Sequence, residues 1–485
     1  MIPNASLLAI VLPIISAFFI YIFGKYAEKY AGWIATVAAS LSVCTILSMV
    51  PDIIKHKPIH DTYAWIRTPS LSLRLGFMVD GLSFCIALVV AVVSALSCLY
   101  SIKYMENSRG QVGYYANLLL FMSGMIGVML SANLIQFYLF WELMLIPSYF
   151  LIASWGVSKK RLTIGFKYFI FTHIGALFML MGILSIYVFT GTFDFVELPQ
   201  VPFDIPPTSI LTVFVLLLIG FCVKMAIFPV HTWLPDAHTE APTPISVMLS
   251  GVMIKCGAYA FARIFLSGFG KTVFQVSNIT STLAILGVIT MIYGGLMALA
   301  QTDIKRLLAY SSISQMGYIF FGLGVYSTMG ATGALFHVLN HAVCKSLLFM
   351  CAGVIIYQTG IRDIRKLGGL ADKMPITCVA ALIGALSLAG TPPLNGFWSE
   401  WMIFSGGIFS GKILITTIAI VSTVITAGYY LWFLWRVFFG TTPKRLENTR
   451  EPSWLMRIPI IVLAVVAVVI GIWPDIVLRL LSVTF

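Results

Sequence analysis

The chain has 485 residues, of which 59% are hydrophobic and only 10% are charged, and its mean hydropathy is +0.97. This composition excludes a soluble globular domain and is typical of a membrane protein with many helical spans. Basic loops on the cytoplasmic side explain the formal net charge of +12 better than nucleic-acid binding does. The eight cysteines form no CxxC pair and no Cys/His ligand spacing, so neither a disulfide nor a metal site is indicated.

Apolar runs of about 20 residues or more are candidate membrane spans. The first run lacks a basic n-region and a small-residue cleavage site, so we interpret it as a span rather than as a signal peptide. The predicted fold class is an all-α polytopic membrane protein with about 14 transmembrane helices. These helices are expected at approximately 4–23, 31–50, 79–102, 113–131, 133–155, 163–190, 208–228, 243–267, 278–300, 304–325, 330–357, 376–409, 412–439 and 457–481.

Proline interrupts two of the predicted helices. Pro229 lies a little over one turn after Lys224 in the seventh, and Pro392 and Pro393 lie in the middle of the twelfth. Proline removes a backbone donor, and freed carbonyls are tolerated at membrane depth where they are buried in protein or line a watery cavity. Paired breaks point to a transporter's working site and suggest a duplicated unit of five helices. The predicted organisation is a three-helix segment at 1–110, five-helix repeats at 111–270 and 271–440, and a C-terminal helix at 441–485.

The lysines and arginines of the loops predict the orientation of the chain. With the N-terminus outside, 18 of the 30 basic residues fall on one side and 8 on the other, and the remaining four lie within spans. The loop with Asp194 and Glu197 has no cation and falls on the side with fewer basic residues. Both termini are therefore predicted to lie outside the cytoplasm.

Three ionisable residues inside predicted spans of the first repeat are the main transport candidates, namely Glu142, Lys224 and Lys255. A charged side chain in hydrocarbon costs roughly 2.5–3.5 kcal/mol on insertion scales. A carboxylate there needs a cation or takes up a proton. We assign Lys224 as the partner of Glu142, because it is the cation at a predicted helix break. These residues are interpreted as titrating transport groups, and a structural ion pair is the alternative.

Four further residues of the first repeat are secondary candidates. Lys167, near the cytoplasmic end of the sixth span, either takes part in transport or extends its ammonium group to the interface. His173 either takes part in transport or is a hydrogen-bonded histidine among apolar neighbours. His231 and His238 lie in the polar loop around the first break.

The eleventh span contains three titratable residues, His337, His341 and Lys345, at i, i+4 and i+8. On a helix these positions form one stripe about 12 Å long. Three titratable groups in a stripe indicate a proton relay. Haem ligation is the rival interpretation for the histidines. It fits poorly, because axial ligands face each other across the iron and residues one turn apart do not.

The neighbouring spans add further polar groups. Ser311, Gln315 and Tyr318 recur at helical spacing in the tenth span, where they either hold water or form hydrogen bonds between helices. Glu400 follows the second break and is the last acid within the membrane, so we expect it to be a terminal exchange group. Such a series of buried groups suits proton translocation. It does not suit a large organic substrate, which needs a specific apolar pocket.

Several long segments resemble the antiporter-like subunits of respiratory complex I and their relatives in Mrp antiporters, membrane-bound hydrogenases and archaeal complexes. The resemblance extends from Val79 to Gly440. It implies fourteen spans with broken helices seven and twelve in two inverted five-helix repeats. It also implies that Glu142 pairs with Lys224, that Lys255 is a middle relay and that Glu400 is the terminal site. The segments are FWELMLIPSYFLI (140–152), WLPDAHTEAPTPISVMLSGVMIKCGAY (233–259) and DIKRLLAYSSISQMGY (303–318).

Within this family the sequence combines features of different subunit types. VDGLS (79–83) and Glu400 resemble the M-type subunit of complex I, whereas FHVLNHAVCKSLLF (336–349), with Lys345, resembles the L-type and Mrp pattern. The first functional hypothesis is an ion-translocating subunit of a redox-driven complex with an NADH-, F420H2-, ferredoxin- or hydrogenase-type donor. The alternatives are a subunit of a sodium/proton antiporter without redox chemistry and a stand-alone symporter for a small solute.

No cofactor is predicted in this chain, because it shows no GxGxxG, P-loop or Cys₄ cluster pattern. The expected partners are other antiporter-like subunits, small membrane subunits and a peripheral redox module that carries iron–sulfur clusters. The lipid bilayer is the expected environment, and no nucleic-acid partner is indicated. The predicted location is the cytoplasmic membrane of a prokaryote.

Overall fold

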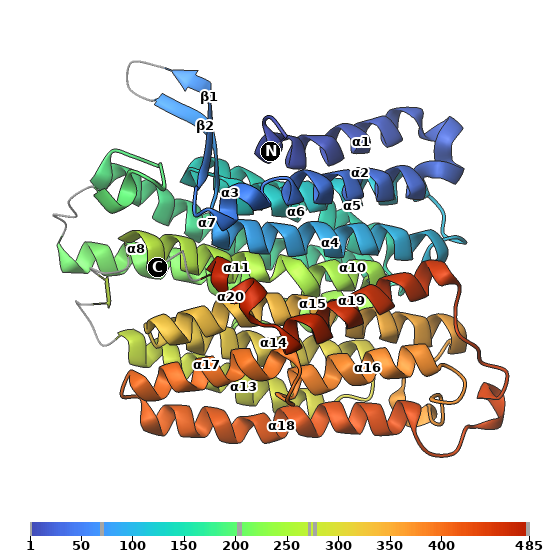
Figure 1. Cartoon of the computed structure of the whole chain (residues 1–485). Helices are drawn as coiled ribbons and strands as arrows, with labels where there is room; N and C mark the ends of the chain where they lie inside the picture. Colours follow the sequence, from blue (N-terminus) through green and yellow to red (C-terminus); the bar gives the residue numbers. More distant parts are fainter. Residues whose placement is uncertain (1, 68–71, 201–205, 270–272, 275–278, 482–485) are drawn as a thin grey trace.

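The structure is a computed structural model that describes residues 2–67, 72–200, 206–269, 273–274 and 279–481. It is a bundle of long helices with one β-hairpin at its edge (Figure 1). Within these ranges, twelve helices are long and apolar enough to cross a membrane. Apolar runs become helices in lipid because every backbone N–H and C=O must find its partner inside the segment. The predicted all-α polytopic fold class is confirmed, whereas the count of fourteen and the two repeats stay predictions.

The N-terminal half consists of seven long helices, two short helices and a helix that contains π turns. The long helices are α1 (Ala5–Ala27), α2 (Ala31–Leu47), α4 (Gly81–Tyr104), α5 (Gln111–Leu130), α6 (Leu134–Trp155), α7 (Arg161–Thr190) and α8 (Pro207–Met225). The short helices are α3 (Val50–Ile54) and α9 (Trp233–Glu240). The interrupted helix consists of α10 (Thr243–Met248), the π turn η3 (Leu249–Met253), α11 (Lys255–Phe261) and a second π segment, η4 (Ala262–Phe269).

The C-terminal half continues with helices that pack beside one another in the lower part of Figure 1. They are α13 (Ile279–Leu299), α14 (Ile304–Gly324), α15 (Thr328–Thr359), α16 (Pro375–Leu388), α17 (Asn395–Phe409), α18 (Ile413–Phe438), α19 (Trp454–Ile472) and α20 (Asp475–Leu481). Single 3₁₀ turns lie at Glu28–Tyr30, Leu198–Gln200, Ile364–Lys366 and Lys444–Leu446.

Both proline-containing segments interrupt helices. Pro229 lies between the end of α8 and the start of α9, and Pro392 and Pro393 lie between α16 and α17. The apolar run expected at 376–409 is therefore two helices. A six-residue link, Ala389–Leu394, joins them, and Gly390 in it has a positive φ of 70°.

A β-hairpin precedes α4 and is not among the predicted elements. Strands β1 (Ile59–Arg67) and β2 (Ser72–Val79) pair antiparallel, with Ile59 opposite Val79. The Tyr63 hydroxyl donates to Asn4 Oδ1, and the Gly76 N–H donates to Gln136 Oε1 at the start of α6. The hairpin therefore joins the N-terminal end of the chain to the helix that carries Glu142.

The two most buried of the twelve span candidates are the helix at Thr243–Leu266 and α15. They contact each other in the middle of the bundle, and α14 packs against α15 (Figure 1). Lys255 lies on the first of these helices, and the His337–His341–Lys345 stripe lies on the second. Four of the ionisable residues predicted to matter are thus on the two most buried span candidates.

Close packing at the second break leads to a stability prediction. A Cβ on Gly396 would lie 1.9 Å from the carbonyl oxygen of Ser387, so Gly396→Ala must push α17 away from α16. Overpacking of this kind typically costs about 1–3 kcal/mol, and we expect a lower midpoint of thermal unfolding in detergent. The matched control is Gly428→Ala in α18, where the new methyl group would meet only Leu299 at 3.8 Å. An equal midpoint for both variants would contradict the prediction.

Candidate functional site

The first of the predicted transport acids, Glu142 on α6, contacts a histidine on α7. Glu142 Oε2 lies 3.2 Å from His173 Nδ1, and the side chains are 19% and 39% exposed. The other carboxylate oxygen receives no hydrogen bond from the described residues. His173 therefore has a direct polar contact with Glu142, and its part in transport stays a prediction.

Lys224 does not form the ion pair with Glu142 that the sequence predicts. It is the second-last residue of α8 and is fully buried, and its Nζ lies 4.9 Å from the ring centre of Trp141. Neighbouring residues of a helix point about 100° apart, so α6 presents Trp141 to Lys224 and turns Glu142 toward α7. A cation–π contact thus replaces the expected ion pair, and no oxygen of the described chain accepts a hydrogen bond from Nζ.

Lys167 has a partner that neither interpretation from the sequence included. Its ammonium group forms an ion pair with Asp236 at 2.7 Å and donates to the carbonyl of Thr232 at 3.1 Å. Arg306 approaches the same carboxylate at 3.5 Å. These contacts attach the short helix α9 to α7 and α14 at the end of the bundle, and a part of Lys167 in transport stays a prediction.

Lys255 lies directly after a π turn. The side chain is buried, and its ammonium group donates to the carbonyl of Ser250 inside that turn. The hydroxyl of Ser250 lies 2.7 Å from that of Ser312 on α14, and a Cβ on Gly251 would lie 2.2 Å from Ser346 Oγ on α15. Isolated π turns inside α-helices are frequent at functional sites. Here the turn brings Lys255 to the meeting point of three buried helices.

His337, His341 and Lys345 form one stripe on α15, as their spacing of four residues predicts. The rings of His337 and His341 stack with their centres 6.1 Å apart. Lys345 donates to Ser311 Oγ and to the carbonyl of Leu308 at 3.1 Å, both on α14. All three side chains of the stripe are buried, and neither ring nitrogen of His341 has a hydrogen-bond partner among the described residues.

His337 connects the stripe to α14 and α17. Its Nε2 lies 2.7 Å from Gln315 Oε1, and its Nδ1 lies 2.9 Å from Ser399 Oγ. Tyr318 stacks on the same ring at 5.9 Å, while its hydroxyl lies 3.0 Å from Thr426 Oγ1 on α18. The polar residues of α14 therefore form hydrogen bonds between helices, and Ser311 and Gln315 use them to hold the titratable stripe.

Glu400 follows Ser399 on α17 and faces the second break. It is 5% exposed, and its Oε1 has no hydrogen-bond partner within the described ranges. A Cβ on Gly390 would lie 2.5 Å from Oε2, so the glycine leaves the space that the carboxyl group occupies. No ion pair joins Glu400 to Lys345 in the described residues, because Lys345 reaches α14 instead.

The two histidines of the first break are buried beside aromatic rings. His231 packs on Phe228 and Tyr293, with ring centres 5.6 and 4.8 Å away. His238 on α9 stacks on Phe349 of α15 at 5.0 Å. His238 thus lies next to the stripe helix, whereas His231 lies against α13.

Two buried cations are predicted from the sequence as loop residues. Lys305 on α14 is 3% exposed and donates to the carbonyl of Ala241, and Arg263 in η4 is 5% exposed and pairs with Asp80. The sequence did contain a signal for the burial of these two cations, because both positions fall inside predicted spans, at 304–325 and 243–267. Lys305 and Arg263 were counted on opposite sides of the membrane. Leaving both out of the count does not change which side has more basic residues.

A network of neutral polar residues at the second break was also missed. Asn340 on α15 donates to the carbonyl of Asn395 at 2.9 Å and to Ser399 Oγ at 3.1 Å. Asn395 Nδ2 donates back to Asn340 Oδ1 at 3.0 Å, and Ser387 Oγ donates to Asn395 Oδ1. Uncharged residues of this kind carry no hydropathy signal strong enough to single them out. Within the described chain, no group of three or more His, Cys, Asp or Glu is placed to hold a metal ion.

Helices long enough to cross a membrane, the most buried of which carry lysines and histidines, define an integral membrane protein with ionisable side chains in its interior. Comparison with known proteins then identifies the family. The family described as "NADH:quinone oxidoreductase/Mrp antiporter, TM" matches residues 131–426, and "NADH-Ubiquinone oxidoreductase (complex I), chain 5 N-terminus" matches 65–115. The chain belongs to the NADH:quinone oxidoreductase/Mrp antiporter family and is an antiporter-like membrane subunit.

The chain resembles subunits of redox enzymes and a subunit of a sodium/proton antiporter. It is 34% identical over 429 residues to F(420)H(2) dehydrogenase subunit M of Methanosarcina mazei, covering 87% of this chain and 85% of that one. It is 33% identical to NADH-quinone oxidoreductase subunit M of Rickettsia felis, covering 97% and 96%. It is 35% identical to a Na(+)/H(+) antiporter subunit of Bacillus subtilis, covering 97% of this chain and 61% of that protein.

Solved structures share the fold. A chain of an archaeal respiratory membrane complex, the membrane-bound sulfane sulfur reductase, superposes with a TM-score of 0.89 at 31% identity, covering 99% of this chain and 77% of that one. A chain of Thermus thermophilus complex I superposes with a TM-score of 0.87 at 24% identity, covering 98% of each. These neighbours are chains of multi-subunit membrane complexes.

Proposed function

We propose that this chain translocates protons through the membrane as a subunit of a redox-driven complex. The observation that carries the proposal is the placement of Lys255 and the His337–His341–Lys345 stripe on the two most buried helices, joined by polar side chains of α14. Two relatives that support the redox-driven interpretation are subunits M of an F(420)H(2) dehydrogenase and of an NADH-quinone oxidoreductase. A peripheral redox module with iron–sulfur clusters is part of this proposal.

Each group has a distinct role in the proposed path. The Glu142–His173 pair and Lys224 receive the proton at the first break, Lys255 passes it to the stripe, and Glu400 exchanges it at the second break. Within the described residues, the hydrogen bonds of the Lys255 and Lys345 ammonium groups all go to neutral oxygens. Charges inside a low-dielectric interior interact strongly, so proton gain at one lysine favours proton loss at the other. This repulsion couples the protonation states of the two lysines.

A sodium/proton antiporter subunit without redox chemistry is the second candidate. Identity of 35% over 497 residues to the Na(+)/H(+) antiporter protein of Bacillus subtilis favours it. The test uses membrane vesicles that contain the assembled complex. Proton uptake driven by oxidation of a donor, with iron–sulfur subunits in the purified complex, supports the first candidate. Proton movement driven only by an imposed sodium gradient, with no redox subunit present, would replace it by the second.

The orientation is part of the same proposal. Reporter fusions after Lys160 and after Lys366 are expected to give a cytoplasmic signal, and a fusion near Asp194 is expected to give an external one. The physical reason is that basic loops are retained in the cytoplasm. A cytoplasmic signal at Asp194 would contradict both the orientation and the span count before it.

A further inference from the structure

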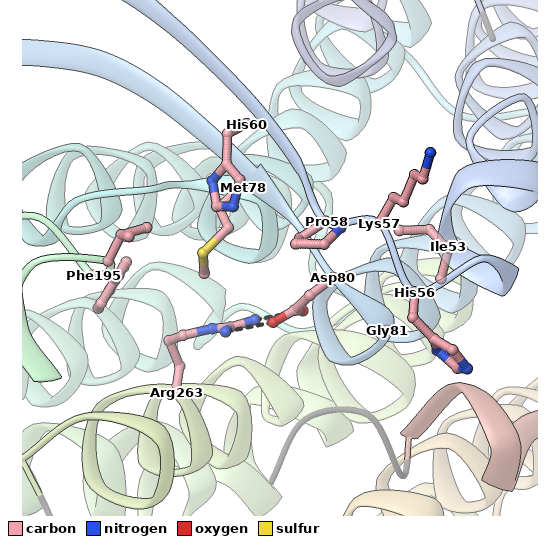
Figure 2. A pocket seen from close by; sticks show the side chains of 11 residues that line it. Ile53, His56, Lys57, Pro58, His60, Met78, Asp80, Gly81, Phe195 and Arg263 are labelled. Carbon is pink, nitrogen blue, oxygen red and sulfur yellow. Dashed lines mark hydrogen bonds and ion pairs between the residues drawn. The ribbon is translucent and has the colours of Figure 1, made fainter.

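A buried ion pair joins the start of α4 to the π segment η4. Arg263 Nη1 and Nη2 donate to Asp80 Oδ2 and Oδ1, each at 2.7 Å (Figure 2). Asp80 also accepts the N–H of Ser83 at 2.9 Å, which caps α4. Arg263 Nε donates to the hydroxyl of Tyr259 at 3.1 Å, and that hydroxyl donates to the carbonyl of Met129 at 2.7 Å. The carboxylate and all three guanidinium nitrogens of the pair therefore take part in directed bonds.

The pair borders a cavity of about 320 Å³ below the hairpin. Figure 2 shows His60, Met78 and Phe195 on the other sides of this space. The cavity lies at the end of the bundle where the chain begins and where α20 packs, because a Cβ on Gly81 would lie 1.9 Å from the carbonyl oxygen of Leu480. The orientation from loop charges assigns this end to the outside.

Lys255 lies on the inner side of the same pair. It precedes Arg263 by eight residues, about two turns of the same helix, and Tyr259 lies halfway between them. Tyr259 is fully buried, and Lys255 is 1% exposed. The ion pair and the tyrosine therefore separate the cavity from the buried lysine that the proposed function uses.

The pair is built to stay charged. Burial would raise the pKa of Asp80, but the charge of Arg263 and the bonds from Arg263 and Ser83 hold it at about 2. Since the folded-state pKa is below the ordinary value of 3.8, the stabilisation is present above that value and is lost only as the pH falls through about 2. At working pH the carboxylate does not take up a proton, so the pair is not a relay.

We propose that the Asp80–Arg263 pair is a seal that prevents water in the hairpin cavity from reaching Lys255. This rests on the proposed function, in which a proton on Lys255 must move to the stripe rather than leave at this end. Two opposite charges that bond to each other attract less water than either charge would attract alone. Removing one partner leaves an uncompensated buried charge, which water entering from the cavity would solvate.

The test measures passive proton conductance in vesicles that contain the assembled complex, under a potassium diffusion potential and without electron donor. Asp80→Asn or Arg263→Gln alone is expected to raise the conductance several-fold over wild type. The double variant Asp80→Asn/Arg263→Gln removes both charges and keeps a capping side chain, so it should leak less than either single variant. Adding Lys255→Met to Asp80→Asn should abolish the extra conductance, because the leak passes through Lys255.

Two matched variants control for general damage. Asp80→Glu keeps the charge on a longer stem, and Asp475→Asn changes an exposed acid that pairs with Arg479 near the same end. Both should conduct like wild type, and a native gel confirms assembly. Wild-type conductance in both single variants, or a leak that persists with Lys255→Met, would overturn the seal. The measurement needs no redox chemistry, so a failure of donor-driven translocation is a separate result.

Discussion

Lys224→Ala and Glu142→Gln are each expected to reduce proton translocation at least about tenfold, which corresponds to 1.4 kcal/mol, while the complex still assembles. Lys224 is buried against Trp141, and Glu142, the next residue of α6, contacts His173 on the other side. The cation thus acts on the carboxylate through space rather than through a shared hydrogen bond. Either substitution removes one of the two charges. The protonation state of the remaining group then no longer responds to a charged neighbour.

The measurement is the pH gradient or membrane potential that vesicles build on addition of the electron donor. Electron transfer assayed in the presence of an uncoupler should stay near the wild-type rate, because no redox centre is predicted in this chain. Lys412→Ala is the matched control. It also removes a partly buried lysine, but one that donates to Thr280 and Ser281 at the end of the bundle. Near-normal pumping in both test variants would show that Glu142 and Lys224 have a structural role and no role in translocation.

Helical periodicity made part of the site predictable from the sequence. His337, His341 and Lys345 belong to one helix, where a spacing of four residues fixes their relative positions whatever the helix packs against. The proline breaks were visible for the same reason, because proline acts on its own backbone. Both predictions depend on local chemistry alone.

Contacts between helices could not be predicted from local sequence patterns. The partner of Glu142 depends on which face of α6 meets α7, and the rotation of a helix is set by tertiary packing. The partner of Lys167, on the short helix α9, depends on how the chain turns after Pro229. For the hairpin a local signal did exist, since Ser72–Val79 alternates polar and apolar residues through most of its length. In a chain dominated by long apolar runs, that short strand pattern was not used.

Glu400→Gln is expected to stop translocation through this chain. The substitution keeps the shape of the side chain and its place beside Gly390, so the close packing at the second break should survive. An amide does not exchange a proton, and no other acid lies in the described residues of α17 to take over the step. His337 contacts Ser399, the neighbour of Glu400, so the stripe would still deliver a proton that has no final acceptor.

Two further variants separate chemistry from packing at this position. Glu400→Asp keeps the titrating group on a shorter stem and should retain partial translocation. His337→Gln keeps hydrogen-bonding capacity toward Ser399 and Gln315 without a titratable ring, and it should impair translocation as severely as Glu400→Gln if the histidines connect Lys345 to the acid. Lys345 itself bonds to α14 and not to Glu400, so the two imidazoles of the stripe are the proposed connection between them. If Glu400→Gln pumps like wild type while His337→Gln does not, the proton leaves the stripe at His337 and the path ends elsewhere than at Glu400.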